Sequence, residues 1–232
     1  MLLLLAPTRF ELEALLGPVP GLGPACVPAP GQRALRVGLV GFGLAAAGIT
    51  TARHLERERP TQVLLVGIAG SFDLARAPLA SVHRIEAVSC HGIGVGEGRE
   101  HIPAARVGFA QIPREICGEE LGERLRLAAP PPPLDRLPAA ELLSATSAAA
   151  NAGEAATRRA QHPRALLEDM EGYAVALAAI LAGAPLSIVR AVSNAIGERD
   201  KTRWEVHAAL SALRLALAPL LASERSSEDR PR

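Results

Sequence analysis

Four short stretches of this sequence place polar side chains or bare backbone directly after an apolar run. They are Glu11, the turn Gly67-Ile68-Ala69-Gly70, the pair Met170-Glu171 and the pair Ser193-Asn194. A carboxylate can activate water or bind sugar hydroxyls, an amide can hold a polar ring, and glycine lets a ligand approach the backbone. If the preceding runs are parallel strands, all four stretches lie at one edge of a sheet, where open α/β sheets bind small molecules. We therefore predict one small-molecule site at this edge.

Each of these residues also has a simple structural explanation when it is considered alone. Glu11 suits the first turn of a helix, where a negative charge interacts favourably with the helix dipole. Asn194 is a common turn residue, and Asp169 can cap the helix that begins near Glu171. The convergence of the four stretches on one edge, rather than any single residue, favours a site.

The elements that must position these residues alternate between short apolar runs and helical patterns. The expected strands are 2–6, 34–40, 62–70, 81–90, 164–169 and 185–194. The expected helices are 9–17, 44–58, the segment that follows Glu171, and 203–221. Apolar strands alternating with helices predict an α/β fold of three layers, α/β/α, with a central mixed, mostly parallel sheet.

The chain of 232 residues, 49% of them hydrophobic, is long enough to bury one complete core. We expect a single domain over 1–222. The proline-rich segment 128–140 is expected to be an extended surface loop, and the polar segment 223–232 a disordered tail.

Composition also excludes several classes of partner. A net charge of +1 is too small an excess of positive charge to indicate binding to nucleic acid or to an anionic membrane. No run approaches the about 18 apolar residues of a membrane span, and the apolar start 2–6 is too short for a signal peptide. Three widely spaced cysteines, Cys26, Cys90 and Cys117, are typical of reduced thiols. We expect a cytoplasmic protein without nucleic-acid or membrane partners.

Two further motifs are weaker indications of a functional site. Gly41-x-Gly43 follows a strand and opens a helix, as in a dinucleotide site, but the next strand ends without the acidic residue that such a site needs. A tight turn explains it better. Cys90-His91 is a weak nucleophile signal, since catalytic pairs meet in space rather than in sequence. The histidines lack metal-ligand spacing, so we expect neither a metal nor a cofactor.

Several of these stretches together resemble the purine nucleoside phosphorylase/nucleosidase superfamily. The motifs are APTRFEL, GIAGSF, DMEGYAVALAA and VRAVSNAIGERD followed by Trp204. Within the superfamily they look most like the futalosine hydrolase family. The resemblance extends from residue 2 to about residue 215. It implies hydrolysis of the N-glycosidic bond of futalosine in menaquinone biosynthesis, and a homodimer or larger homo-oligomer.

The resemblance also implies roles for individual residues. Glu11 matches the carboxylate that activates the attacking water, Glu171 the carboxylate that binds ribose hydroxyls, and Met170 the thioether that packs on the sugar. Gly67, Ala69, Gly70 and Ser193 belong to the matching substrate-binding stretches. Asn194 stands where adenine-cleaving nucleosidases carry the aspartate that protonates the purine at N7.

Two departures from the adenine-cleaving pattern concern specificity. An amide at Asn194 suits a 6-oxopurine such as hypoxanthine, because Asn can donate to an acceptor but cannot deliver an acidic proton. Ile68 replaces a serine, which removes a hydroxyl ligand for water or phosphate from that turn.

The alternatives are a methylthioadenosine/adenosylhomocysteine nucleosidase, against which Asn194 argues, and a phosphate-dependent nucleoside phosphorylase. A third, of a different class, is a non-catalytic protein that binds purine nucleosides.

Overall fold

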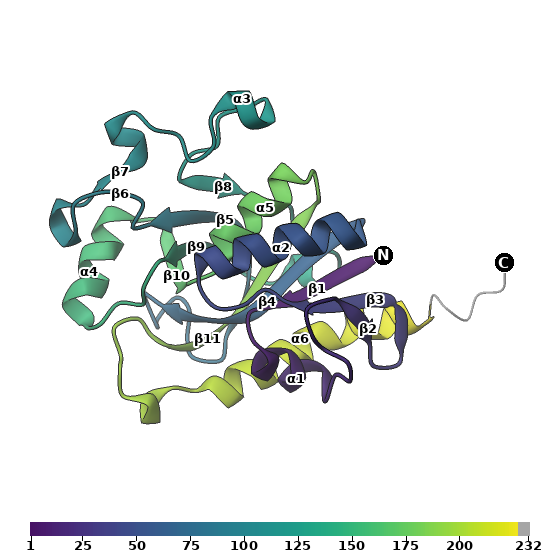
Figure 1. Cartoon of the computed structure of the whole chain (residues 1–232). Helices are drawn as coiled ribbons and strands as arrows, with labels where there is room; N and C mark the ends of the chain where they lie inside the picture. Colours follow the sequence, from purple (N-terminus) through teal and green to yellow (C-terminus); the bar gives the residue numbers. More distant parts are fainter. Residues whose placement is uncertain (227–232) are drawn as a thin grey trace.

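The computed structural model describes residues 1–226 and is built around a nine-stranded sheet (Figure 1). Eight of these strands follow the order β10-β9-β5-β11-β4-β1-β3-β2, and β8 pairs with β5. The strands are β1 Leu2–Ala6, β2 Val27–Ala29, β3 Gln32–Leu39, β4 Gln62–Ser71, β5 Val82–His91, β8 Arg124–Arg126, β9 Ala139–Ala145, β10 Ala165–Asp169 and β11 Leu186–Ala195. A separate hairpin joins β6 Gly94–Val95 to β7 Ile102–Pro103.

The sheet is mixed, and its strand directions explain how the edge of the site is formed. The strands β3, β1, β4 and β11 are parallel to one another, whereas β5 runs antiparallel to β11. β10 is antiparallel to β4 and overlaps it only at two pairs, Leu167 with Ser71 and Glu168 with Gly70. Our expectation that every site residue follows a strand of one parallel set is therefore wrong for β10. Its carboxyl end still meets that of β4, because the two strands overlap only there.

Helices cover both faces of the sheet, which gives the three layers expected (Figure 1). The helices are α1 Arg9–Leu16, α2 Leu44–Glu58, α3 Arg114–Cys117, α4 Ala152–Gln161, α5 Gly172–Leu181 and α6 Val206–Ser226. α1 and α6 pack on one face, and α2 and α5 pack together on the other. The alternation of β1 accounts for this: Leu2 and Leu4 enter the core under α1 and α6, and Leu3 and Leu5 enter the core under α2 and α5.

Most expected elements are present, with shifts of a few residues at their ends. The expected helix 44–58 coincides with α2. β9 and α4 were not anticipated. The proline-rich segment is not extended throughout, because Leu134–Arg136 form a short 3-10 helix and Leu134 is buried. The expected tail begins inside α6, which continues to Ser226, and its remainder lies outside the described residues.

One helical segment, Lys201–Ala222, is long and apolar enough to cross a bilayer by length and composition, contrary to our expectation. Its packing is that of a helix that covers a sheet. The residues that it buries recur every three or four positions, which is one helical face, and they lie in the core with β1 and β3. They are Ala209, Leu210, Leu213, Leu217 and Leu220.

Candidate active site

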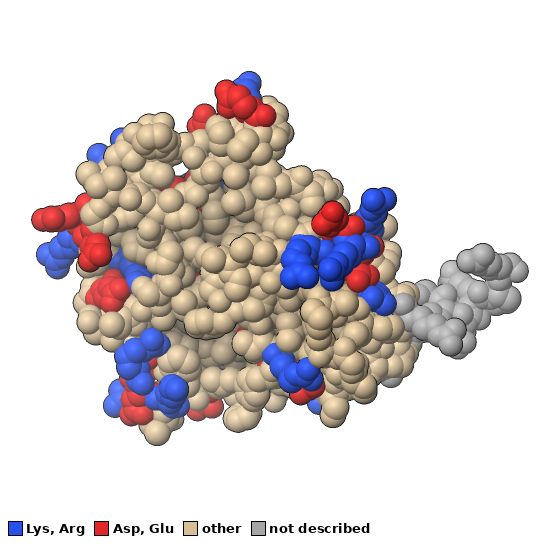
Figure 2. Space-filling model, viewed as in Figure 1, with Lys and Arg blue, Asp and Glu red and all other residues tan. Residues whose placement is uncertain are grey.

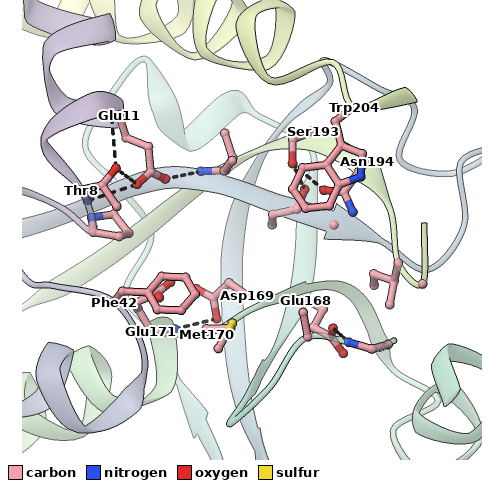
Figure 3. A pocket seen from close by; sticks show the side chains of 18 of the residues that line it. Thr8, Glu11, Phe42, Glu168, Asp169, Met170, Glu171, Ser193, Asn194 and Trp204 are labelled. Atoms are coloured by element: carbon pink, nitrogen blue, oxygen red, sulfur yellow. Dashed lines mark hydrogen bonds between the residues drawn. The ribbon is translucent and has the colours of Figure 1, made fainter. Parts of the chain in front are cut away.

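A cavity of about 320 Å³ lies where β1, β4, β10 and β11 end (Figure 3). All the predicted site residues except Gly67 line it, and Thr8, Ile68, Glu168 and Asp169 line it with them. The structure therefore brings together residues that are more than 180 positions apart in the chain. Figure 3 shows Glu11 and Thr8 at one end of one side of the cavity and Ser193 and Asn194 at its other end, with Met170 and Glu171 on the facing side.

Glu11 is fixed by the start of α1. It is the third residue of the helix, and its Oε2 accepts hydrogen bonds from the backbone N–H and hydroxyl of Thr8, the N-cap residue, at 3.1 and 2.7 Å. This capping box holds the carboxylate in one orientation. Oε1 accepts a hydrogen bond from the Ile68 backbone N–H at 3.1 Å, so the turn at the end of β4 also positions Glu11. The start of a helix therefore explains the position of Glu11 only in part.

Gly67 lies beneath Glu11 rather than in the wall of the cavity. A Cβ at this position would be 2.8 Å from both Glu11 Oε1 and Arg190 Nη1, so glycine permits the approach of these two groups. Arg190 is fully buried, and its Nη1 has no hydrogen-bond partner in the described structure. An unpaired N–H of a buried guanidinium beside a carboxylate can bind a polar ligand atom. Arg190 was missed in the sequence because it lies inside an apolar strand.

Glu171 is held by the turn that precedes α2. Its Oε1 accepts a hydrogen bond from the Gly43 backbone N–H at 2.9 Å. Gly41 and Gly43 both have φ of 84°, which confirms the tight turn inferred from their sequence. Burial and the charge of Asp169 raise the pKa of Glu171 to about 7, with Arg190 and the Gly43 N–H acting in the opposite direction. Glu171 is the N-cap residue of α5 but does not cap it with its side chain.

Asp169 performs the capping expected of it and also forms a buried ion pair. Its carboxylate accepts hydrogen bonds from the Gly172 backbone N–H and from Arg190 Nη2 and Nε, at 3.0, 2.7 and 3.1 Å. The Ser144 hydroxyl donates to its other oxygen. A Cβ at Gly172 would lie 2.9 Å from Asp169 Oδ2 and 2.7 Å from Leu142 Cδ2. Any larger residue at position 172 would therefore displace these neighbouring side chains.

The amide of Asn194 has a defined orientation. Ser193 Oγ donates to Asn194 Oδ1 at 2.7 Å, and Asn194 Nδ2 donates to the Ala195 carbonyl at 2.8 Å. A carbonyl can only accept, so the nitrogen must face Ala195. Among residues 1–226, Ala195 is the one hydrogen-bond acceptor of this nitrogen, so its second N–H is available to a ligand.

Three aromatic side chains line the cavity, none of which the sequence assigned to it. Phe42 comes from the turn before α2, Phe10 from α1, and Trp204 from the segment before α6. Trp204 is held by a hydrogen bond from its Nε1 to the Glu198 carbonyl at 3.0 Å, and the Arg199 guanidinium lies 5.1 Å from its ring centre. In Figure 3 the Trp204 ring lies beside Asn194, and the Phe42 ring lies near Met170.

Sequence analysis also missed Glu168, which it included in the expected strand 164–169 without a role in the site. It is 6% exposed and lines the cavity. Its carboxylate pairs with Arg158 Nη1 at 3.0 Å and accepts a hydrogen bond from the Ala149 backbone N–H at 3.3 Å. Burial raises the pKa of Glu168, and Arg158 opposes this effect.

Of the two motifs with a weaker claim, Gly41-x-Gly43 borders the cavity through the Gly43 N–H and Phe42, whereas Cys90-His91 lies elsewhere. Cys90 is buried outside the cavity, and burial together with Glu123 and Asp169 raises the pKa of its thiol to about 12. Such a thiol is a poor nucleophile at neutral pH. Within residues 1–226, no three His, Cys, Asp or Glu side chains are grouped so as to hold a metal ion.

Known proteins share this fold and sequence pattern. The sequence model of the phosphorylase superfamily matches residues 21–223. Futalosine hydrolase of Streptomyces coelicolor is 31% identical over 229 residues, which covers 87% of this chain and 91% of that protein. Futalosine hydrolase of Thermus thermophilus is 33% identical over 245 residues, which covers 100% of both.

Solved structures agree on the fold. The 5′-methylthioadenosine/S-adenosylhomocysteine nucleosidase of Neisseria meningitidis has a TM-score of 0.71 at 17% identity, covering 96% of this chain and 98% of that chain. Futalosine hydrolase of Helicobacter pylori has a TM-score of 0.69 at 16% identity, covering 98% of this chain and 97% of that chain.

The chain therefore belongs to the phosphorylase superfamily, as its three-layer fold and the position of its cavity already indicate. Within the superfamily it is an enzyme of the nucleosidase group, and its curated relatives at 31–33% identity are futalosine hydrolases. The resemblance predicted from the sequence motifs is confirmed.

Proposed function

We propose that this protein hydrolyses the N-glycosidic bond of futalosine, releasing hypoxanthine and dehypoxanthine futalosine, in menaquinone biosynthesis in the cytoplasm. The observation that carries the proposal is the arrangement of one cavity. The Glu11 carboxylate lies at one end, the Asn194 amide lies at the other, and Glu171 and Met170 lie on the facing side (Figure 3). The curated relatives named above support futalosine as the substrate.

Glycosidic cleavage develops positive charge on the sugar and negative charge on the leaving base, and water must attack the opposite side of the anomeric carbon. Glu11 is suited to the water, because Oε1 keeps acceptor capacity beside the Ile68 N–H. The unpaired Nη1 of Arg190 lies close to Gly67, as Glu11 Oε1 does. It can donate a hydrogen bond to the water oxygen while Glu11 accepts a proton from the water.

Glu171 is suited to the ribose. It is held by the Gly43 N–H, and its remaining oxygen can accept hydrogen bonds from sugar hydroxyls. Met170, beside it in the wall, offers an apolar surface to the sugar ring. Binding energy from these contacts would hold the anomeric carbon between the water and the leaving base.

Asn194 is suited to the leaving base. Its free N–H can donate to N7 or O6 of hypoxanthine and so stabilise the charge that develops there. It cannot supply the acidic proton that an aspartate would deliver to adenine N7.

Parallel assays of futalosine, methylthioadenosine and inosine, each with and without phosphate, test the proposal. We expect hypoxanthine release from futalosine that does not require phosphate. Release of adenine from methylthioadenosine as the main activity would contradict it. A strict requirement for phosphate would instead indicate a phosphorylase.

A further inference from the structure

Glu168 lies opposite Asn194 across a single glycine. In the sheet, Gly70 of β4 is paired with Glu168 of β10 on one side and with Asn194 of β11 on the other. Residues that are directly paired across strands project to the same face of a sheet. The two side chains therefore flank Gly70 on the face that lines the cavity, with backbones about two strand spacings, or roughly 10 Å, apart.

The space between the two side chains suits a flat ring. Gly70 adds no side chain there, and because a Cβ would lie 2.7 Å from Ile196 Cγ1, the Ile196 side chain rests on the Gly70 backbone as an apolar part of the wall. Ala148 and Ala149, in the loop beside Glu168, add only small side chains to the wall. A base whose N7 or O6 meets Asn194 thus presents its far edge toward Glu168.

The carboxylate of Glu168 is kept as a hydrogen-bond acceptor by its partners. Arg158 is 4% exposed, pairs with Glu168 Oε2 and also donates to the Ser147 carbonyl at 2.7 Å and to Glu154 at 2.7 Å. The Ala149 N–H occupies only one of the lone pairs of Oε1. Each carboxylate oxygen can accept more than one hydrogen bond, so Glu168 retains capacity for a ligand donor.

We propose that Glu168 is a specificity-determining residue that accepts a hydrogen bond from N1–H of a 6-oxopurine base. A 6-oxopurine carries a hydrogen on N1, whereas a 6-aminopurine presents a lone pair there. An ionised carboxylate has only acceptors, so the 6-aminopurine would face it with two unpaired lone pairs. Asn194 and Glu168 would then form hydrogen bonds with opposite ends of the same edge of the base. The inference rests on the proposed function, because it assumes that a purine occupies this end of the cavity.

The test compares binding of three free bases by isothermal titration calorimetry at pH 8: hypoxanthine, 1-methylhypoxanthine and adenine. We expect the wild-type protein to bind hypoxanthine at least about tenfold more tightly than either of the others, as for a hydrogen bond to a charged group. Glu168→Gln should reduce this preference about tenfold, because the amide can also donate to N1 of adenine.

Glu154→Gln is the matched control. It removes the other carboxylate partner of Arg158 without altering the wall of the cavity, so it should keep the preference for hypoxanthine. If Glu154→Gln loses the preference as Glu168→Gln does, the effect comes from Arg158 and the proposal is wrong.

The methylated base keeps the proposal testable even if Glu168→Gln fails to fold. Equal affinity of the wild-type protein for hypoxanthine and 1-methylhypoxanthine, or no detectable binding of either, overturns the role of Glu168. A futalosine assay on the same preparation separates the two proposals. Hydrolysis of futalosine without a preference among the bases refutes only the role of Glu168, and a clear preference without hydrolysis refutes only the proposed function.

Discussion

Glu11 and Glu171 are both buried carboxylates, but their surroundings separate their roles. Glu11 is held by Thr8 and Ile68 and lies beside the unpaired Arg190 nitrogen, whereas Glu171 is held by the Gly43 N–H. We predict that Glu11→Gln lowers kcat by about 10²- to 10⁴-fold, the usual contribution of a general base, while hypoxanthine affinity stays within about twofold. Single-turnover kinetics and calorimetry measure the two quantities. A variant with near wild-type turnover would show that Glu11 is not the base.

Glu171 links function to stability through its pKa of about 7, raised from 4.5 by burial and the nearby Asp169 charge. The folded state retains a proton that the unfolded state has lost between these two values, so wild-type stability falls as pH rises through about 7. We predict that Glu171→Gln, which removes the buried charge, increases the free energy of unfolding by about 1–3 kcal/mol at pH 8.

That gain should shrink toward pH 5, where Glu171 is protonated in the folded protein, and urea denaturation at both pH values measures it. The same variant should weaken ligand binding and turnover if Glu171 holds the ribose. Glu120→Gln, at an exposed carboxylate, serves as control. A gain that is equal at both pH values would contradict the assigned pKa shift.

At this scale the sequence was informative where a polar residue follows an apolar run. Glu11, Glu171 and Asn194 could be selected because they interrupt the pattern at the end of a strand. Arg190 could not, because it lies inside an apolar strand. Glu168 could not, because only the pairing of β4 with β10 and with β11 shows that it faces Asn194 across Gly70. Trp204 reaches the cavity from a loop, and its position depends on tertiary packing rather than on any local pattern.

At the scale of elements, close packing at the junction between β10 and α5 restricts which residue fits at position 172. Gly172 begins α5 with Asp169 and Leu142 in close contact. We predict that Gly172→Ala lowers the free energy of unfolding by about 1–3 kcal/mol, the usual cost of overpacking, despite the better helix propensity of alanine. Gly122→Ala, where a Cβ meets nothing within 4 Å, should have little effect. Chemical denaturation of both variants measures the difference, and equal effects would contradict the role of the close contact.

The elements themselves were predictable to the extent that their patterns are local. The helix 44–58 was located correctly because its apolar spacing and its flanking glycine and charges agree. β9 was missed because it begins within the proline-rich segment, and α4 because its alanines and charges do not form a clear apolar stripe. The antiparallel overlap of β10 with β4 depends on contacts distant in sequence, which no local pattern reports.

At the scale of the whole molecule, the face over α2 and α5 is notably apolar. Figure 2 shows mostly uncharged side chains over the start of α2 and the centre of this face, and a cluster of charged side chains over the end of α2. A groove between the two helices is lined mainly by apolar residues, and Ile49 and Leu181 there are 66% and 44% exposed. Large exposed apolar patches mark interaction sites. We propose that a second copy of the chain covers this face, in a homodimer or larger assembly.

We predict that Ile49→Glu shifts the protein toward the monomer, because it places a charge in the covered groove. Size-exclusion chromatography with light scattering measures the mass. Leu74→Glu, at a residue that is 41% exposed and outside this groove, should leave the assembly unchanged. A monomeric wild-type protein would refute the assembly, and an Ile49→Glu variant of unchanged mass would refute this face as the interface.

The most direct test of the proposed reaction is product analysis after incubation with futalosine in ¹⁸O-labelled water containing phosphate. If Glu11 activates water and Asn194 holds the leaving hypoxanthine, mass spectrometry should detect free hypoxanthine and a sugar product with ¹⁸O on its anomeric carbon. A sugar 1-phosphate without the label, or no cleavage of futalosine under conditions where methylthioadenosine loses adenine, would contradict the proposed function.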